Sequence, residues 1–328
     1  MLVRDWHDVD DTTVAGLFAA EKVRWREQLS WDTTAMWPVV EAGRRAGTVA
    51  GAIAYDEAGV PDGWCFALLQ DDTLQVGGFL ARTPQMTSVL LDGLARSTDG
   101  QAARRWIWFG YFDAPGLPEA IAARGGTSAR YVYLRCRLVR QEGRTASPGS
   151  GEAPRLVRAW RASDAVAVPA LLASAYASHD ASRPFAPTGQ MDEWQKYTAI
   201  LVGSDGCGVF DPGLSLVADA LGGGLDAAAV VTRITPATAH LAQLAVRADA
   251  QAAGIGRALL TAAQARAGAA GCTELTLLVH EHNAHARRLY RRAGFVEDAS
   301  FLSAGWDVRQ PRTSSSDALA TGGVKTRR

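Results

Sequence analysis

A loop of small residues in the second half of this 328-residue chain carries the clearest chemical signal. A strand pattern over residues 239–246 precedes the loop, and apolar residues recur at helical spacing over 254–269 behind it. The loop reads Gln251-Ala252-Ala253-Gly254-Ile255-Gly256-Arg257. A small-residue loop that opens a helix leaves backbone N–H groups unpaired, and the helix dipole strengthens their hold on an anion. The segment therefore predicts a phosphate site, although an ordinary strand-to-helix turn has a similar composition.

Two polar residues downstream have a spacing that fits the same site. A β-rich run over 275–279 is followed by a short predicted helix at 284–293, which Gly294 closes. Tyr290 follows Asn283 by seven residues, or about two helical turns, so both side chains face the same way. Asn283 also suits the N-cap of this helix, and Tyr290 would also suit a core position.

These segments together resemble the GNAT superfamily of acyl-CoA-dependent N-acyltransferases. The motifs that carry the resemblance are Leu244-Ala245-Val246, Gln251-x-x-Gly254-x-Gly256 and Asn283-x-x-Ala286-x-x-x-Tyr290-x-x-x-Gly294-Phe295. The match is close over 230–307, and the organisation of 155–230 is compatible with it. The resemblance implies an α/β (α+β) fold, with a mixed, mostly antiparallel twisted sheet flanked by helices.

The resemblance also implies roles for individual residues. Acetyl-CoA, or another short acyl-CoA, is the implied acyl donor. The residues implied to bind it are Leu244, Ala245, Val246, Gln251, Ala252, Ala253, Gly254, Ile255, Gly256, Arg257 and Asn283. In the family the strand that ends at Val246 splays from its neighbour, and a backbone N–H there stabilises the oxyanion. Tyr290 is the implied acid for the departing thiolate, since a phenol of pKa about 10 can protonate a thiolate whose conjugate acid has a pKa of about 8.5.

A base is needed because an alkyl amine is mostly protonated at neutral pH. His240 is the candidate, since the period of two in a strand places it on one face with Ala242, Leu244 and Val246. Arylalkylamine acetyltransferases of the same superfamily carry a catalytic histidine at this position. A water molecule could take the proton instead, and His240 would then be a half-buried strand residue.

Other polar residues are weaker candidates. Those that could contact the substrate are Asp180, Glu193, Glu281 and His282. A metal site at His280 and His282 is conceivable from their spacing, but the family uses none, and we predict no metal. The alternative for all of these residues is ordinary solvated surface.

The first half repeats the order of elements found in the second. Strand patterns at 74–80, 106–109 and 131–134 alternate with helix patterns at 85–97 and 119–124. The counterpart of the glycine loop, Arg82-Thr83-Pro84-Gln85-Met86-Thr87, has no glycine, and Pro84 lacks an N–H. We therefore predict two tandem GNAT folds of which the first is degenerate. The expected organisation is a degenerate domain at 1–140, a linker at 141–154, a catalytic domain at 155–310 and a flexible tail at 311–328.

Composition narrows the possible partners and compartment. The chain has 34 basic and 34 acidic residues, and this balance argues against nucleic acid or an anionic membrane as partner. No apolar run approaches membrane-spanning length, and the N-terminus lacks a signal-peptide pattern. The four cysteines form no CxxC pair and are expected to be reduced, buried thiols. A cytoplasmic monomer of two similar halves, or a homodimer, is expected.

The predicted function is acyl transfer to a primary amine of a small metabolite or natural product, by direct attack in a ternary complex. None of the cysteines falls in the motif, so no covalent acyl-enzyme is expected. Alternatives are a mycothiol synthase-like acetyltransferase, acyl transfer to a thiol and a non-catalytic acyl-CoA-binding scaffold. Trp106 and Trp108 share one strand face and form either core or an aromatic wall of the acceptor pocket.

Overall fold

The computed structural model describes the chain except residues 111, 113, 139–156, 178–184, 204–207 and 309–328. The predicted linker and tail lie outside the described residues. The strands of the first half are β1 (Leu2–Asp5), β2 (Ala50–Tyr55), β3 (Pro61–Gln70), β4 (Thr73–Leu80), β5 (Arg105–Gly110) and β6 (Thr127–Arg137). Its helices are α1 (Asp11–Leu29), α2 (Met36–Ala46), α3 (Pro84–Arg96), α4 (Thr98–Ala102) and α5 (Leu117–Ala123), with a short 3-10 turn η1 (Trp6–Asp8).

The second half contains every element predicted around the motif. Its strands are β7 (Val157–Ala159), β8 (Val209–Phe210), β9 (Leu216–Asp219), β10 (Leu225–Thr235), β11 (Thr238–Val246), β12 (Glu274–His280) and β13 (Val296–Asp307). Its helices are α6 (Asp164–Tyr176), α7 (Met191–Gly203), α8 (Ile255–Ala269) and α9 (Ala284–Arg292), with a 3-10 turn η3 (Ala248–Ala250). The mixed α/β architecture is confirmed.

The described strands form one thirteen-stranded sheet that runs through both halves. The order is β1-β2-β3-β4-β5-β13-β6-β12-β11-β10-β9-β7, and β8 pairs with β10. Neighbouring described strands are antiparallel except for two parallel pairs, β4 with β5 and β11 with β12. Each half holds one of these parallel pairs: α3 and α4 connect β4 to β5, and α8 connects β11 to β12.

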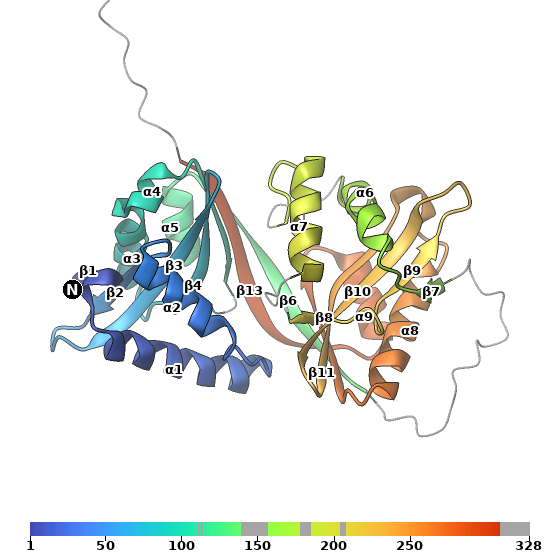
Figure 1. The fold of residues 1–328 in the computed structure, drawn as a ribbon, viewed down its shortest axis with the longest axis horizontal. Helices are drawn as coiled ribbons and strands as arrows, with labels where there is room; N and C mark the ends of the chain where they lie inside the picture. The colour runs from blue at the N-terminus through green and yellow to red at the C-terminus, as the bar shows by residue number, and fades with distance from the viewer. Residues whose placement is uncertain (111, 113, 139–156, 178–184, 204–207, 309–328) are drawn as a thin grey trace, which may run out of the picture.

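The last strand of each half is exchanged. β6 leaves the first half and pairs with β12, while β13 leaves the second half and pairs with β5 and β6. Both strands run diagonally between the two halves (Figure 1). Leu134 lies opposite Leu277, and Trp306 lies opposite Trp106. Each half therefore depends on the other to complete its sheet.

A β-bulge recurs at the same place in both halves. In the first half the register shifts between Phe66 and Ala67 of β3, where β4 carries the extra residue Gly77. In the second half it shifts between Val230 and Val231 of β10, where β11 carries an extra residue. Since both bulges lie just beyond a parallel ladder, the repeat extends from the order of elements to local geometry.

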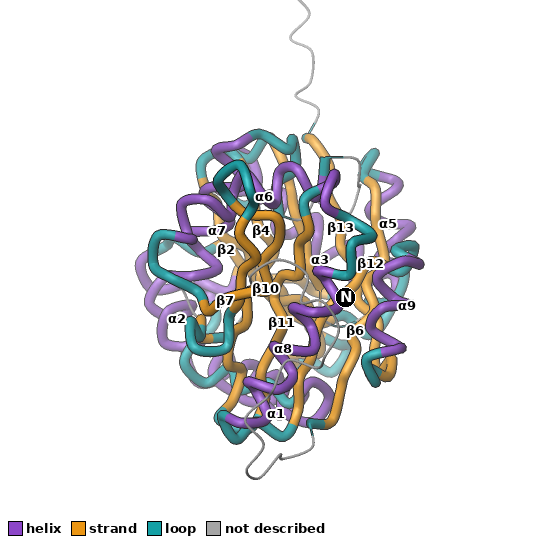
Figure 2. The backbone as a smooth tube through the Cα atoms, turned by 90° about the vertical axis from the view of Figure 1, so that its right-hand side faces the viewer, coloured by secondary structure: helices purple, strands orange, loops and turns teal. Residues whose placement is uncertain are grey.

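Helices cover both faces of the sheet. Figure 2 shows α2 and α7 on one side of the strands and α5 and α9 on the other. On the second side, Leu90 and Leu94 of α3 and Leu259 and Leu260 of α8 lie in the apolar cores of the two halves. Apolar residues at i, i+4 spacing explain why these helices bury one stripe. In the described chain no helix combines the length and apolarity needed to span a bilayer.

Candidate active site

The parallel ladder between β11 and β12 stops halfway along both strands. Its last pair is Leu241 with Leu277, whereas β11 continues to Val246 and β12 to His280. The bulge residue in β11 is Ala242, directly after the last pair. Because a bulge bends its strand away from the regular ladder, the two strands diverge from this point. The splay expected from the resemblance is present.

The N–H of Val246 points into the gap between the diverging strands. On the opposite side of β11, the Arg247 N–H donates to the Asp226 carbonyl of the β10 side at 2.8 Å. Successive N–H groups of an antiparallel strand alternate between its two sides. The Val246 N–H is therefore directed toward β12, beyond the end of the parallel ladder. A carbonyl oxygen placed in the gap would meet this donor.

The loop before α8 presents a row of backbone donors. Among the described residues, no acceptor receives a hydrogen bond from the N–H groups of residues 251–257, and the first helical bond runs from Ala258 to Gly254 at 3.0 Å. Gly254 at the N-cap has a φ of 79°, the left-handed conformation that favours glycine. The Gln251 side chain donates to the Val246 carbonyl at 3.2 Å and fixes the loop to the strand end. The arrangement fits a pyrophosphate.

The three parts of the motif converge in space. A Cβ built at Gly256 would lie 3.3 Å from Val246 Cγ2 and 3.9 Å from Leu289 Cδ2. The start of α8 thus lies against both the end of β11 and helix α9. Asn283 is the N-cap of α9, as predicted, and its side-chain oxygen accepts from the Ala286 N–H at 3.0 Å.

Tyr290 is buried on α9, with 7% of its surface exposed. Its ring lies 5.8 Å from that of Phe295, and no described residue bonds its hydroxyl. Burial raises the pKa of the Tyr290 phenol above its ordinary value, and the nearby Tyr176 phenol acts in the same direction. The proton therefore stays on the phenol throughout the neutral range.

The corresponding site of the first half is closed. At the start of α3 the Thr83 side chain accepts from the Met86 N–H at 3.1 Å, and Pro84 has no N–H. A Cβ built at the bulge residue Gly77 would lie only 2.3 Å from Cε2 of the Phe66 ring. The Phe66 side chain therefore lies beside the bulge of the first half.

A comparison with known families agrees with this geometry. Residues 177–295 match the model described as the Acetyltransferase (GNAT) family. This range contains the splayed strand, the donor loop and α9. The second half of the chain is therefore similar to GNAT domains over most of its described length.

Individual relatives agree with this assignment. The chain is 32% identical over 219 residues to a protein named mycothiol acetyltransferase from Clavibacter michiganensis subsp. michiganensis, and it spans 64% of that relative's length. It is similar to the crystal structure of a GCN5-related N-acetyltransferase from Sphaerobacter thermophilus, with a TM-score of 0.56, 18% identity and coverage of 79% of this chain and 81% of the other. A GNAT-family acetyltransferase from Colwellia psychrerythraea has a TM-score of 0.51 and 12% identity, and the likeness covers 94% of this chain and all (100%) of that one. The likeness in fold includes both halves.

The predicted common face of His240 with Leu244 and Val246 is wrong. The extra residue Ala242 breaks the alternation, so Leu244 and Val246 face the core under α8 and α9. His240 faces the opposite side of the sheet, where its ring lies 5.5 Å from that of Trp31. A strand pattern without the bulge cannot show this change of face.

The imidazole of His240 is neutral near pH 7 and is bonded to Thr276. Its Nδ1 lies 2.9 Å from Thr276 Oγ1, and that hydroxyl donates to the Ala239 carbonyl at 3.3 Å. This contact fixes the orientation of the imidazole ring. Burial lowers the pKa of His240 to about 4.

This pKa predicts an acid-sensitive contribution to stability. Above pH 6.5 His240 is mostly neutral in both the folded and the unfolded protein. Between pH 6.5 and about 4 the unfolded protein binds a proton at this residue and the folded protein does not. We expect His240 to lower the free energy of unfolding by about 3 kcal/mol across that window. Urea unfolding of His240→Asn should lack this loss. His282→Asn, which changes an exposed side chain, is the control, and equal pH slopes in all three proteins would contradict the prediction.

The weaker substrate candidates are dispersed. Asp180 lies outside the described residues. Glu193 accepts from the Thr188 N–H at 2.8 Å and lies 3.8 Å from Arg105 Nη1, so its carboxylate already has partners. Glu281 and His282 follow the end of β12, and Glu281 Oε1 lies 3.6 Å from His282 Nε2. Among the residues that can be described, no group of three or more His, Cys, Asp or Glu side chains could hold a metal ion.

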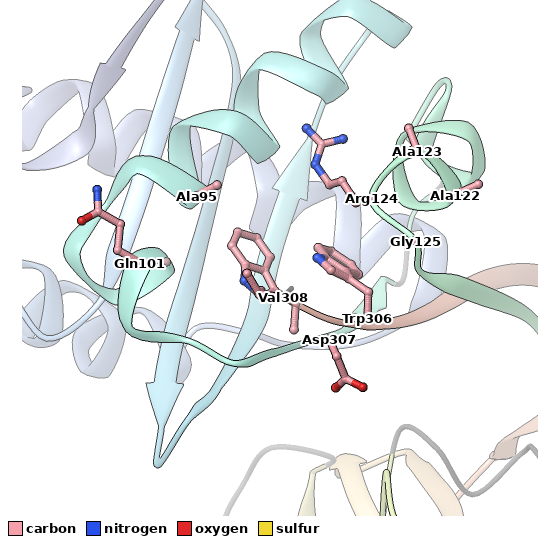
Figure 3. Close-up of a pocket in the computed structure, with 11 residues that line it drawn as sticks. Ala95, Gln101, Ala122, Ala123, Arg124, Gly125, Trp306, Asp307 and Val308 are labelled. Atoms are coloured by element: carbon pink, nitrogen blue, oxygen red, sulfur yellow. The ribbon is translucent and has the colours of Figure 1, made fainter. Parts of the chain in front are cut away.

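Trp106 and Trp108 belong to the core of the first half. Both are buried under α3 and α5, and Trp106 stacks on Trp306 with ring centres 5.2 Å apart. Figure 3 shows Trp306 among the residues that line a hollow. The hollow has a volume of about 620 Å³, and its lining comes from α3, α4, β5, the end of α5 and the end of β13. No motif residue lines this hollow. The two tryptophans therefore do not form a wall beside the GNAT motif.

No sequence pattern indicated the polar network that does border the gap. The Tyr176 hydroxyl donates to Gln243 Oε1 at 2.8 Å, and Gln243 Nε2 donates to the Tyr197 hydroxyl at 2.6 Å. Gln243 directly follows the bulge residue and is only 4% exposed. In a strand of small and apolar residues its importance becomes visible only from the register. Burial raises the pKa of Tyr176 to about 12, so this hydroxyl also keeps its proton.

Proposed function

We propose that the protein is an acyltransferase that moves an acetyl or other short acyl group from acyl-CoA to a primary amine of a small molecule. The observation that carries the proposal is the gap beside Val246. On one side it is bordered by residues 251–257, whose backbone N–H groups have no acceptor in the described part of the chain, and α9 brings Tyr290 to the same core. A candidate pyrophosphate site, an oxyanion donor and a proton donor thus lie close together in the second half.

The residues divide the reaction into three tasks. The N–H groups of residues 251–257 hold the pyrophosphate, and the gap holds the arm that carries the thioester. As the amine nitrogen attacks the carbonyl carbon, the Val246 N–H donates to the oxygen on which negative charge develops. The carbon–sulfur bond then breaks, and Tyr290 gives its proton to the sulfur. The supporting geometry is the direction of the Val246 N–H and the unbonded hydroxyl of Tyr290.

We assign removal of the amine proton to a water molecule rather than to His240. A base with a pKa of about 4 accepts a proton poorly from an ammonium group whose pKa is near 10. The His240 ring is also enclosed by the rings of Trp31 and Tyr133, whose centres lie 5.5 and 6.4 Å from it. Its role in this proposal is to stabilise the strand pair through Thr276.

Two other functions share part of the support. The relative named mycothiol acetyltransferase favours a role of that kind, or acyl transfer to a thiol. The closed site of the first half distinguishes this chain from tandem enzymes with two well-formed phosphate loops. A non-catalytic acyl-CoA-binding scaffold would need the loop but not Tyr290.

The direct test is release of CoA from acetyl-CoA in the presence of a broad panel of small amines, with mass detection of the acylated product. Product formation with at least one primary amine is the expected result. If acetyl-CoA binds and no amine or thiol releases CoA, the protein is a scaffold and the proposal fails.

Calorimetric titration should find one acetyl-CoA site per chain. Gly254→Leu is expected to weaken binding by about 100-fold, because a side chain in the left-handed conformation displaces the loop and costs about two charge-assisted hydrogen bonds. Gly271→Leu is a matched control, since Gly271 closes the other end of α8 with a φ of 85° and no atom near its Cβ position. Two sites per chain, or equal effects of both substitutions, would refute the single-site prediction.

A further inference from the structure

A series of aromatic side chains connects β11 to β12, the two strands that border the gap. It begins on β11, where Gln243 bonds the Tyr197 hydroxyl at 2.6 Å. Ring centres then follow at 4.9 Å from Tyr197 to Phe185 and 6.3 Å from Phe185 to Phe109. We name the side chains of Tyr197, Phe185, Phe109, Tyr131 and His280 the aromatic rim.

The other end of the rim lies on β12. The Phe109 ring lies 5.2 Å from Tyr131, and the Tyr131 ring lies 5.3 Å from His280, the last residue of β12. The rim therefore starts beside the bulge on β11 and returns to the end of β12. These side chains therefore lie around the gap between β11 and β12, on the face of the sheet opposite α8 and α9.

The rim is assembled from both halves of the chain. Phe109 and Tyr131 come from β5 and β6 of the first half, and the other members come from the second half. Phe109 alternates with Trp108 along β5, so it faces away from the core of the first half. On the same face Arg105 reaches Glu193 of α7 at 3.8 Å. The degenerate half is thus placed to provide part of the second half's site.

The exposure and charge of the rim point to its ligand. Phe109, Phe185, Tyr197 and His280 are each half-buried, although aromatic rings in mutual contact usually lie in a core. No Asp or Glu belongs to the rim, and Glu193 nearby already has the Thr188 N–H and Arg105 as partners. Ring faces bind flat apolar groups and also attract a cationic amine. Phe109 and Phe185 offer no hydrogen-bonding group to a hydroxylated amine.

We propose that the aromatic rim is the acceptor pocket and that the acceptor amine is carried on an aromatic or similarly flat apolar body. This inference rests on the proposed acyl transfer. The first half, which lacks a phosphate loop, then contributes to acceptor selection through Phe109 and Tyr131.

The test compares 2-phenylethylamine, n-butylamine and glucosamine as acceptors for the full chain. We expect kcat/KM for 2-phenylethylamine to exceed that of the other two by at least about 10-fold. Phe109→Ala should lower kcat/KM for 2-phenylethylamine by about 10-fold, mainly through KM, with the acetyl-CoA affinity unchanged. Ile107→Ala changes the same face of β5 two residues away and is the matched control.

An experiment on the unmodified protein avoids dependence on how the variant folds. 2-Phenylethanol, which has the same body without the amine, should inhibit competitively against the amine and not against acetyl-CoA. A preference for glucosamine, no inhibition by 2-phenylethanol, or equal effects of the Phe109 and Ile107 substitutions would overturn the inference while acyl transfer stands. Absence of CoA release with every amine would overturn the proposed function and this inference with it.

Discussion

Replacement of Tyr290 by phenylalanine should lower kcat by about 10²- to 10⁴-fold, the range expected for loss of a general acid. The ring contacts with Phe295 remain, because only the hydroxyl is removed. Acetyl-CoA affinity, measured by calorimetry, should therefore be unchanged. Since burial raises the pKa of Tyr290, the wild-type protein should show no loss of activity from its ionisation below about pH 10.

A control separates the role of the acid from the loss of any buried hydroxyl. Tyr55 is buried at 9% exposure in the first half, away from the gap, and Tyr55→Phe should leave kcat unchanged. If Tyr290→Phe retains full activity with an amine that the wild type acylates, Tyr290 is not the acid, although the acyltransferase assignment would remain.

Removal of β13 should unfold the whole protein rather than one half. β13 is the partner of both β5 and β6, and its Phe301, Leu302 and Trp306 are buried. Burial of such side chains contributes about 1.5–3 kcal/mol each, which together approaches the 5–15 kcal/mol that stabilises a typical domain. A chain that ends at residue 295 should lose its cooperative unfolding transition in circular dichroism. It should also lose acetyl-CoA binding, although the donor loop is intact.

The matched truncation ends at residue 308 and keeps every described strand. It should unfold with the midpoint of the full chain. If residues 1–140 or 155–310 expressed alone gave a cooperative transition, the exchange of β6 and β13 would not be needed for folding, and the interdependence of the halves would be refuted.

Local patterns predicted the elements around the motif because the signals lie within a few residues of one another. The helical spacing after Gly254 predicted α8, and the β-rich run before His280 predicted β12. The cap at Asn283 was predicted from residue type alone and is confirmed by its bond to Ala286. The repeat was visible in the order of elements, since each unit repeats strand, helix, strand, helix and strand.

The face of His240 could not be predicted because it depends on a single inserted residue. Alternation along a strand holds only while the register is regular, and the bulge at Ala242 shifts every later side chain to the other face. Nothing in the residue types from His240 to Val246 marks that position. The same bulge places Gln243 where its amide bonds two tyrosines.

The sequence by itself determined the donor loop at 251–257, the helix that holds Asn283 and Tyr290, and the loss of a counterpart at Arg82–Thr87. These features depend on backbone conformation and spacing within one segment. Only the tertiary structure decided that β6 and β13 exchange, that β11 and β12 diverge at Ala242, and that Phe109 and Tyr131 border the gap. Such features depend on pairing between segments up to about two hundred residues apart, as between Arg105 and Asp307. Strand pairing at that distance is set by the packing of the whole sheet, which no local pattern records.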